Sequence, residues 1–567
     1  MIQACIERQL QAATLAALPE ADITKVLVRP CADPGHGDYQ TNALMGLAKQ
    51  QQRNPREFAA EVVSQLDVSE WCEPVEIAGP GFLNFRLKSD ILSESVRKAL
   101  SDEAPFVAKT EEPMTVVIDF SSPNVAKPMH VGHIRSTILG DSLARVMRLL
   151  GHRVVTDNHI GDWGTQFGML LLGWKTQLNE AALETDPIAE LERLYKLING
   201  DESLRDEARA ELVKLQSGDE ENLGIWKQMI QLSQKQFDEV YGRLGVNFDE
   251  TLGESFYNPM LTRVTDELKE QGIAEESDGA WVVFFKGHKQ LSENPAIVRK
   301  RDGAANYTTT DLATIRHRVT EWDPDEIVYV TDGRQQLHFQ QLFEIVRRWD
   351  IETKGKLEHV WFGSILGPDG KPFKTRSGEV VRLADLLDEA EERAYETVSG
   401  KNPGLDEARR RDIARVVGLG ALKYADLSNN RQSDYVFDWD KMLALQGNTA
   451  PYLQYAYTRV RSIFRKLDDP KIDSTSLKFE APEEIALAKH LMNFGPTLEK
   501  VAAEHRPNFL CNYLFELAGH FSRFYEACPV AKAEEVEQNS RLALCELTGR
   551  VLQIGLDALG IDVSEVM

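Results

Sequence analysis

MTVVIDFSSPNVAKPMHVGHIRSTILGDSLARVMRLLG, residues 114–151, is the segment from which the architecture of this chain can be worked out. Residues 114–120 form an apolar, β-branched run that ends at Ser-Ser-Pro-Asn, a pattern typical of a short buried strand. From Ile134 onward apolar side chains recur at helical spacing until Gly151, which favours a helix end. The segment therefore predicts a strand, a loop and a helix in succession, the unit of a parallel sheet.

Two histidines lie where this strand is followed by its helix, in the sequence His130-Val131-Gly132-His133. Proteins with parallel sheets bind phosphates at this place, through free N–H groups and the positive end of the helix dipole. Gly132 lets a nucleotide approach the backbone, and the imidazoles of His130 and His133 can donate to phosphate oxygens whose charge grows during a reaction. The alternative is a pair of histidines that only satisfy backbone groups, but the strand and helix around them favour phosphate binding.

The composition is that of a large globular protein with several domains. Its 567 residues are too many for one core, and 42% hydrophobic and 27% charged residues are ordinary values. Without an apolar run of membrane-spanning length or a secretory signal, we expect no membrane partner and a cytoplasmic location. The six cysteines are far apart and are predicted to be reduced thiols, so no metal site is expected. A net charge of −24 argues against nonspecific binding to polyanions.

Three regions follow each other along the chain. Residues 1–110 alternate helical stretches, such as Pro55–Leu66, with short strands and are predicted to form an α+β module. Residues 113–400 alternate strands and helices, which predicts an α/β fold with a doubly wound parallel sheet. Within it, charged and helix-favouring residues from about 174 to 250 predict a helical insertion. Further strands are expected at Arg153–Asp157, Trp281–Phe285, Glu326–Val330 and His359–Phe362.

Residues 401–567 contain no strand signal and are predicted to form an all-α bundle. The expected helices are Asp406–Lys423, Ala450–Leu467, Pro482–Glu504, Asn508–Ala527 and Ser540–Leu559.

A second segment with features of a phosphate-binding loop is GPDGKPFKTRSG, residues 367–378. Its glycines favour mobility, and Lys371, Lys374 and Arg376 place cations along it. By itself it is more simply explained as an exposed basic turn. Together with the histidine pair on the same predicted sheet, it suits a triphosphate that loses pyrophosphate, with Mg²⁺ bridging the phosphates and few or no protein ligands. We therefore expect in-line attack at an α-phosphate by a carboxylate, which needs no general base.

The chain resembles the arginyl-tRNA synthetase family, which belongs to the class I aminoacyl-tRNA synthetases. The resemblance covers nearly the whole chain and lies in FSSPNVAKPM (120–129), GDWGTQFG (161–168), YTTTD (307–311), FKTRSG (373–378), KYADLS (423–428), GNTAPYLQYAY (447–457) and LDALGI (556–561). It implies that the chain ligates L-arginine to its tRNA with ATP through an arginyl-adenylate. It also implies a Rossmann-like catalytic domain, an N-terminal tRNA-binding module, a C-terminal anticodon-binding domain, a monomer, and no DNA partner.

The same resemblance assigns residues to each substrate. Those implied for arginine are Ser122, Asn124 and His133 around its α-amino and carboxylate groups, and Tyr307, Asp311 and Gln335 in the side-chain pocket, with Asp119 a further acidic candidate. Those implied for ATP and catalysis are His130, Gly132, His133, Lys371, Lys374 and Arg376.

The lysine loop departs from the family pattern Lys-Met-Ser-Lys-Ser. One register matches Lys371 and Lys374 to the two lysines, whereas a register anchored on Phe373 and Gly378 leaves no lysine at the second position. In relatives without that lysine, the lysine just before the histidine motif is thought to replace it, and here that is Lys127. All three lysines remain candidates for the catalytic charge.

The chemistry of arginine independently favours an acidic pocket. A guanidinium is a planar fork of five donors and requires a carboxylate that accepts two of them. Tyr307 and Asp311 are four residues apart, so on a helix they would share a face. The alternative for Asp311 is an ordinary acidic residue in the first turn of a helix.

Two surfaces are candidates for tRNA. The helix predicted at 450–467 interleaves aromatic side chains with cations, and Tyr457, Arg459 and Arg461 are its candidate contacts. An aromatic core face beside a solvated basic face explains that pattern equally well. In the N-terminal module the resemblance implies Phe82 and Asn84 as base contacts, and tRNA is expected to be required for arginine activation.

Two other functions share part of these features. A small-molecule nucleotidyltransferase can carry the histidine motif and the sheet, but it has no evident need for the C-terminal helices. A noncatalytic tRNA-binding relative would be expected to lose catalytic residues, whereas His130, His133 and Lys371 are all present.

Overall fold

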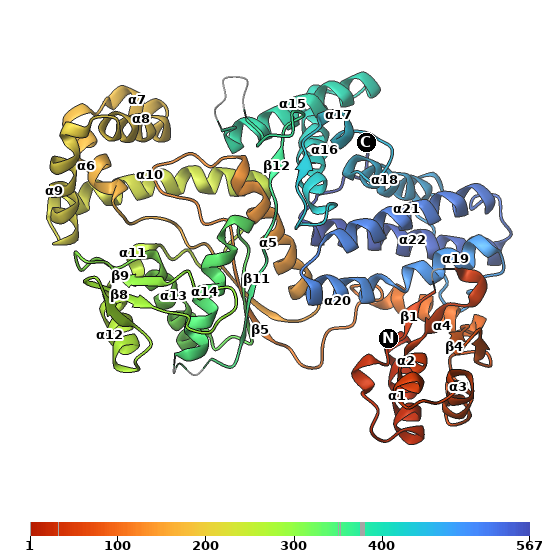
Figure 1. Cartoon of the computed structure of the whole chain (residues 1–567). Helices are drawn as coiled ribbons and strands as arrows, with labels where there is room; N and C mark the ends of the chain where they lie inside the picture. Colours follow the sequence, from red (N-terminus) through yellow and green to blue (C-terminus); the bar gives the residue numbers. More distant parts are fainter. Residues whose placement is uncertain (1, 32, 350, 352, 375–379) are drawn as a thin grey trace. The chain divides into compact units, whose positions relative to one another are not determined.

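The computed structural model describes residues 2–567 apart from 32, 350, 352 and 375–379 (Figure 1). The chain folds into two compact units. The first contains Met1–Ala108, Ala456–Thr497 and Tyr513–Ile554, and the second contains Lys109–Tyr455, Leu498–Asn512 and Gly555–Met567.

A four-stranded parallel sheet lies at the centre of the second unit, with the order β11-β10-β5-β6. Its strands are β5 (Thr115–Asp119), β6 (Arg153–Asp157), β10 (Glu326–Tyr329) and β11 (Lys356–His359). Val117 of β5 pairs with Val155 of β6 on one side and Ile327 of β10 on the other. The prediction of a parallel α/β sheet is confirmed, and the last strand begins three residues earlier than expected.

The order of the strands identifies where this sheet is expected to bind a ligand. After β5, helix α5 (Val131–Leu149) leads to β6 on one side, whereas the chain later returns as β10 on the other side of β5. The winding therefore reverses between β5 and β10. In open parallel sheets, ligands bind outside the carboxyl ends of the strands at this reversal.

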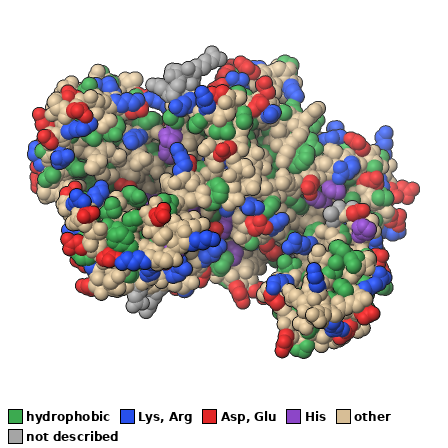
Figure 2. Space-filling view, in the orientation of Figure 1, with side chains coloured by type: hydrophobic (Ala, Val, Ile, Leu, Met, Phe, Trp, Pro, Cys, Tyr) green, Lys and Arg blue, Asp and Glu red, His purple; other side chains and the backbone are tan. Residues whose placement is uncertain are grey.

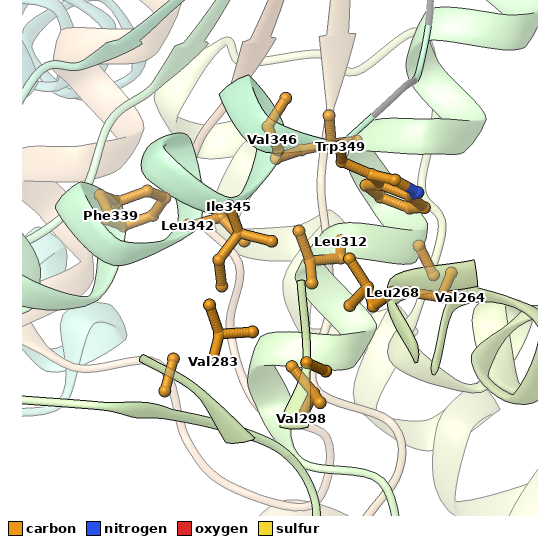
Figure 3. Close-up of a cluster of buried hydrophobic side chains, with 14 of the residues drawn as sticks. Val264, Leu268, Val283, Val298, Leu312, Phe339, Leu342, Ile345, Val346 and Trp349 are labelled. Carbon is orange, nitrogen blue, oxygen red and sulfur yellow. The ribbon is translucent and has the colours of Figure 1, made fainter. Parts of the chain in front are cut away.

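A buried apolar cluster fixes the helices that flank the sheet (Figure 3). Its members come from α12 (Leu261–Glu270), α13 (Tyr307–Trp322), α14 (Gln336–Arg348) and the strands β8 (Ala280–Val283) and β9 (Ala296–Arg299). Leu312, Leu342 and Ile345 are fully buried in it. Since burying one such side chain contributes roughly 1.5–3 kcal/mol, α13 and α14 are held firmly against each other.

The strand expected at Trp281–Phe285 does not join the parallel sheet. It forms β8, the middle strand of an antiparallel sheet with β7 (Glu275–Ser277) and β9. Asp278 and Gly279 connect β7 to β8 and have φ of 51° and 78°. Both values suit the two-residue hairpin turn that Asp-Gly favours, so local turn chemistry makes this segment a hairpin.

The insertion expected at 174–250 consists mainly of helices. They are α6 (Gln166–Gln177), α7 (Glu180–Thr185), α8 (Pro187–Asn199), α9 (Arg205–Gln216) and α10 (Glu220–Leu244), and α11 (Glu254–Tyr257) follows. Asp186 caps α8 by accepting a hydrogen bond from the Ala189 N–H at 3.0 Å.

Helices α15 (Leu383–Lys401) and α16 (Glu407–Leu427) pack against each other and belong to the same unit as the sheet. A buried ion pair joins α16 to α5, with Arg135 Nε 3.1 Å from an Asp426 carboxylate oxygen and both side chains 1% exposed. Arg135 also donates to the carbonyls of Arg431 and Ser433. Residues 407–433 are therefore fixed to the first sheet helix. The short strand β12 (Ile365–Leu366) pairs in parallel with β13 (Tyr435–Val436), so the prediction that residues 401–567 contain no strand is wrong at these two residues.

The first unit begins with an antiparallel sheet of order β1-β2-β4-β3. Its elements are α1 (Ile2–Ala17), β1 (Arg29–Pro30), β2 (Tyr39–Thr41), α2 (Ala43–Gln50), α3 (Pro55–Ser64), β3 (Glu76–Ala78), β4 (Phe82–Phe85) and α4 (Ser89–Ser101). This sheet and its helices confirm the predicted α+β character.

The C-terminal helices are α17 (Trp439–Met442), α18 (Ala450–Lys466), α19 (Pro482–Leu491), α20 (Phe494–Glu504), α21 (Asn508–Ala527) and α22 (Glu535–Ala558). The single helix predicted at 482–504 is wrong, because a turn at Met492 and Asn493 divides it. Pro496 lies in the first turn of α20, where its missing N–H has no helical partner to lose.

Acidic and basic side chains are interspersed over the face seen in Figure 2. In the described part of the chain, no helix combines the length and the apolar character needed to cross a bilayer.

Candidate active site

The loop between β5 and α5 has an unusual backbone. Ser121, Ser122 and Ala126 have φ of 71°, 50° and 61°, in the left-handed region that side chains disfavour. Such residues cost about 1–3 kcal/mol each and persist only where the surroundings fix them. Here the Ser121 N–H donates to Ser136 Oγ at 2.8 Å, and the Ala126 N–H donates to Ser233 Oγ at 2.9 Å. The loop is thus held in one shape by α5 and α10.

Ser122 and Asn124 lie in this loop at the carboxyl end of the sheet. Ser122 Oγ donates to Asp119 Oδ1 at 3.0 Å, and its N–H donates to Asn158 Oδ1 at 3.1 Å. Asn124 pairs with Gly161 as a parallel bridge and has an exposed side chain. A Cβ on Gly161 would lie 2.3 Å from Asn124 Oδ1, so only glycine lets the amide take this position.

The two histidines begin α5 and cap it. His130 Nδ1 accepts the Gly132 N–H, and His133 Nδ1 accepts the His130 N–H, each at 3.0 Å. The two rings lie 3.9 Å apart. A neutral imidazole that accepts at Nδ1 carries its proton at Nε2, so both side chains have an Nε2–H available to donate.

The environment keeps both imidazoles neutral. Burial, together with the neighbouring His130, lowers the pKa of His133 to about 3. Burial also lowers the pKa of His130, and the cations of Arg334 and Lys127 lower it further. Around neutral pH the pair therefore offers hydrogen-bond donors and no charge.

The segment after the lysine loop is bonded directly to the histidine segment. The Val131 N–H donates to the Val381 carbonyl, and the Leu383 N–H donates to the Met129 carbonyl, each at 2.9 Å. These two hydrogen bonds form a backbone seam between the histidine segment and residues 381–383.

Lys371 and Lys374 are both exposed, and Lys374 pairs with Val380 across the base of the loop. Arg376 lies outside the described residues.

At the ends of β5 and β6, Asp119 and Asp157 share one buried guanidinium. Arg318 Nη2 lies 2.6 Å from Asp119 Oδ2 and 2.7 Å from Asp157 Oδ2, and its side chain is 0% exposed. Burial lowers the pKa of Arg318, but the two carboxylates outweigh it and hold the pKa well above the ordinary value. Both oxygens of Asp119 are engaged, one by Arg318 and the other by Ser122.

Replacing Arg318 should strongly destabilise the fold. Arg318→Met leaves two buried carboxylates without their partner, for which we expect a loss of about 3–5 kcal/mol in the free energy of unfolding. Urea denaturation of both proteins measures it. Arg263→Met, which removes an exposed ion pair with Glu267, is the matched control and should cost less than about 1 kcal/mol. An equally small loss in Arg318→Met would contradict the role given to this triad.

Tyr307 and Asp311 lie in the first turns of α13, and His338 of α14 contacts both. His338 Nε2 lies 2.6 Å from Asp311 Oδ2, and its ring meets the Tyr307 ring edge-on at 4.9 Å. The expected common face of Tyr307 and Asp311 is therefore present. Arg318 lies two helical turns further along α13, so the helix links this pocket to the end of β5.

Glu254, at the start of α11, is an acidic group that the sequence analysis missed. Burial raises its pKa to about 7, while His159 lowers it and Asp311 and Asp162 raise it. Helices α11 and α13 pack against each other, and Asp311 of α13 is among the groups that raise this pKa. A guanidinium placed near both carboxyl groups would relieve their repulsion.

The residues predicted to bind arginine and ATP fall into two groups, both near the carboxyl ends of the sheet strands. Ser122, Asn124 and the histidines follow β5, and Gln335 ends a short turn (Gly333–Gln335) after the adjacent strand β10. Gln335 is exposed. Tyr307 and Asp311 form the second group, connected to the first by α13.

The candidate tRNA residues lie in the first unit and differ in exposure. Arg459 is half-buried with its guanidinium 4.5 Å from the Tyr525 ring centroid, and Arg461 Nη1 lies 3.2 Å from Glu546 Oε2. Tyr457 and Asn84 are buried, at 3% and 5% exposure, whereas Phe82 is half-buried. The arginines and Phe82 are thus the more accessible of these side chains.

Comparison with known families agrees with this geometry. Residues 95–439 match the family described as tRNA synthetases class I (R), catalytic domain. Residues 453–567 match the DALR anticodon binding domain, and residues 1–87 match the arginyl tRNA synthetase N terminal domain. The sheet, the histidine pair and these matches define a class I aminoacyl-tRNA synthetase.

Similar proteins specify the amino acid. Arginine–tRNA ligases of Chromobacterium violaceum and Vibrio vulnificus are each 48% identical, over 100% of this chain and of theirs. The arginyl-tRNA synthetase structure from Plasmodium falciparum has a TM-score of 0.84 and 29% identity, covering 100% of this chain and 99% of that one. That from Thermus thermophilus has a TM-score of 0.83 and 26% identity, covering 99% and 100%. The chain belongs to the arginyl-tRNA synthetase family and ligates arginine to tRNA.

Proposed function

We propose that ATP and arginine meet at the carboxyl end of β5, where the arginine carboxylate attacks the α-phosphate to give arginyl-adenylate and pyrophosphate. The adenylate then transfers its arginyl group to tRNA, releasing AMP. The observation that carries this proposal is the pair of neutral histidines at the reversal of the sheet, whose strand β5 is linked through Arg318 of α13 to Asp311 on the same helix, with Glu254 on the neighbouring helix α11.

Each group has a distinct task in this proposal. The Nε2–H groups of His130 and His133 donate to phosphate oxygens as their negative charge increases. Ser122 and Asn124 orient the α-amino and carboxylate ends of arginine, while Asp311 and Glu254 accept the guanidinium and Tyr307 covers it. Asp119 acts through Ser122, because its second oxygen is committed to Arg318. Gln335 extends from the neighbouring strand end toward the same substrate.

Positive charge for the leaving pyrophosphate comes from Lys127, Lys371, Lys374 and Arg376. Mg²⁺ would be bound through the ATP phosphates and would neutralise part of their charge. Among the described residues, no group of three or more His, Cys, Asp and Glu side chains is arranged to hold a metal.

Pyrophosphate exchange and aminoacylation test the proposal directly. The purified chain should exchange labelled pyrophosphate into ATP with arginine and no other standard amino acid, and only when tRNA is present. It should then charge tRNA with arginine. Robust exchange without tRNA would contradict the tRNA requirement, and exchange with a different amino acid would contradict the pocket.

Arginine binding should strengthen as the pH rises from 6 to 8. With a pKa of about 7, roughly a tenth of the Glu254 carboxyl groups are ionised at pH 6 and about nine tenths at pH 8. Only the ionised form pairs with a guanidinium, so KM for arginine should fall up to about tenfold over this range. Glu254→Gln should raise KM and flatten the dependence. The same pH dependence in both proteins would exclude Glu254 as its source.

We propose that Arg459 and Arg461 bind tRNA on the anticodon side, and that Phe82 contacts the tRNA from the N-terminal module. Tyr457 and Asn84 are buried, so their contribution would be to support these neighbours.

Arg459→Ala should weaken tRNA binding and lower the slope of log K against log salt by about one. Arg461 already pairs with Glu546, so Arg461→Ala should have the smaller effect. Filter binding at several salt concentrations measures both, with Lys478→Ala as an exposed control. A salt slope unchanged in Arg459→Ala would remove this residue from the phosphate contacts.

We further propose that residues 1–110 form the N-terminal module and that the anticodon-binding domain begins near 450 rather than at 401. The buried Arg135–Asp426 pair joins α16 to α5, and it supports assigning residues 401–436 to the catalytic domain. Because one chain supplies the active site and both tRNA surfaces, we propose that the protein is a monomer. We also propose that it is cytoplasmic and has no DNA partner.

A further inference from the structure

Helix α8 of the insertion contacts the lysine that precedes the histidine motif. Lys127 Nζ lies 5.2 Å from the centroid of the Tyr195 ring. Lys127 is three residues before His130, and its cation is among the groups that lower the pKa of that histidine. The ammonium held by Tyr195 is therefore also within electrostatic reach of the proposed phosphate site.

Tyr195 is held in place by the packing of α8. Ile188, Leu191, Leu194 and Ile198 form the buried stripe of this helix. Tyr195 and Glu192 are three residues apart and half-buried, so they share another face of α8. The ring thus extends from an anchored helix.

The same face of α8 also contacts the segment that follows the lysine loop. Arg382 Nη1 lies 3.4 Å from Asp186 Oδ2, and its Nη2 lies 3.5 Å from Glu192 Oε2. Arg382 pairs with His130 as an antiparallel bridge. Asp186, Glu192 and Tyr195 therefore contact both segments that carry the proposed catalytic cations.

An open cavity of about 640 Å³ lies beside this contact. Its lining includes Pro128, Met129, Asp186, Pro187 and Arg382. The two residues directly after Lys127 thus border this open space.

We propose that Tyr195 is a positioning residue that keeps the Lys127 ammonium beside the start of α5 and gives it up when the phosphates of ATP bind. An aromatic ring suits this task better than a carboxylate. The ring attracts the cation through its face but satisfies none of its N–H donors, so a phosphate oxygen competes successfully for them. A carboxylate would pair with the ammonium and oppose its transfer to ATP. The inference rests on the proposed role of Lys127 in catalysis.

A double-mutant cycle on the full chain tests this inference. We expect Tyr195→Leu to lower kcat/KM for ATP about three- to tenfold in tRNA-dependent pyrophosphate exchange, with KM for arginine unchanged. Tyr195→Phe keeps the ring and should behave as the wild type. In a Lys127→Ala background, Tyr195→Leu should cause no further loss, because the group that it positions is gone.

Leu197→Ala controls for general damage to α8, because Leu197 is on the same helix and 44% exposed. It should leave the kinetics unchanged, and thermal unfolding should show that all variants are folded.

Three outcomes would overturn the inference. These are an equal loss in Tyr195→Phe, a loss from Tyr195→Leu that persists in full without Lys127, and wild-type exchange by Lys127→Ala. The last would remove Lys127 from catalysis while leaving arginine ligation itself intact, which aminoacylation by the wild type checks separately.

Discussion

Asp311→Asn should lower kcat/KM for arginine about 10²–10³-fold in tRNA-dependent pyrophosphate exchange. Removing one partner of a close charge pair costs roughly 2–5 kcal/mol, because the other charge is left without a partner. The substituted amide retains the size of the side chain and can still accept from His338, which lies 2.6 Å away. The loss should therefore appear in KM for arginine and in kcat, while KM for ATP stays near the wild-type value.

Asp323→Asn is the matched control for this substitution. Asp323 is the C-cap of the same helix, has φ of 43°, and pairs with Lys354 at the surface. Asparagine tolerates this backbone conformation, so the variant should keep its activity and stability. Wild-type charging by Asp311→Asn would show that the arginine pocket is elsewhere.

His133→Ala should slow pyrophosphate exchange about 10²–10³-fold and lower the free energy of unfolding by about 1 kcal/mol. The first effect follows from the lost Nε2–H donor, and the second from the lost acceptor for the His130 N–H. Steady-state exchange and urea denaturation measure the two effects separately.

Two further substitutions separate these roles of His133. Asparagine places an acceptor near the Nδ1 position, so His133→Asn should recover stability but remain slow. Glutamine places a donor near the Nε2 position, so His133→Gln should recover part of the rate. If His133→Ala exchanges pyrophosphate at the wild-type rate, the histidine does not act on the phosphates.

The sheet and its histidine site could be predicted because their signals are local and mutually consistent. An apolar run, a polar loop and a helical repeat follow each other within residues 114–151, and β5 and α5 have nearly the predicted bounds. The C-terminal helices have apolar repeats long enough that each helix can be predicted even when its ends are misplaced by a few residues. The break at Met492 could have been found from Gly495 and Pro496 just beyond it.

Other features depend on contacts that the sequence does not display. Glu254 lies in no motif, and Asp311 influences its pKa only because α11 and α13 pack together. His338 is 27 residues from Asp311, and Arg318 joins two strands that are adjacent only in the folded sheet. The Asp278-Gly279 pair is a local signal for a hairpin. The sequence analysis nevertheless expects the strand at Trp281–Phe285 in the parallel sheet, which is wrong.

The backbone seam between Val131 and Val381 has a consequence for biosynthesis. Val381 is made 250 residues after Val131, and at 5–20 residues per second this takes roughly 12–50 s. Until then the histidine segment on a growing chain lacks its hydrogen-bonded neighbour, and for most of that time β5 lacks β10. A nascent chain on the ribosome therefore stays unable to activate arginine until most of it has been translated.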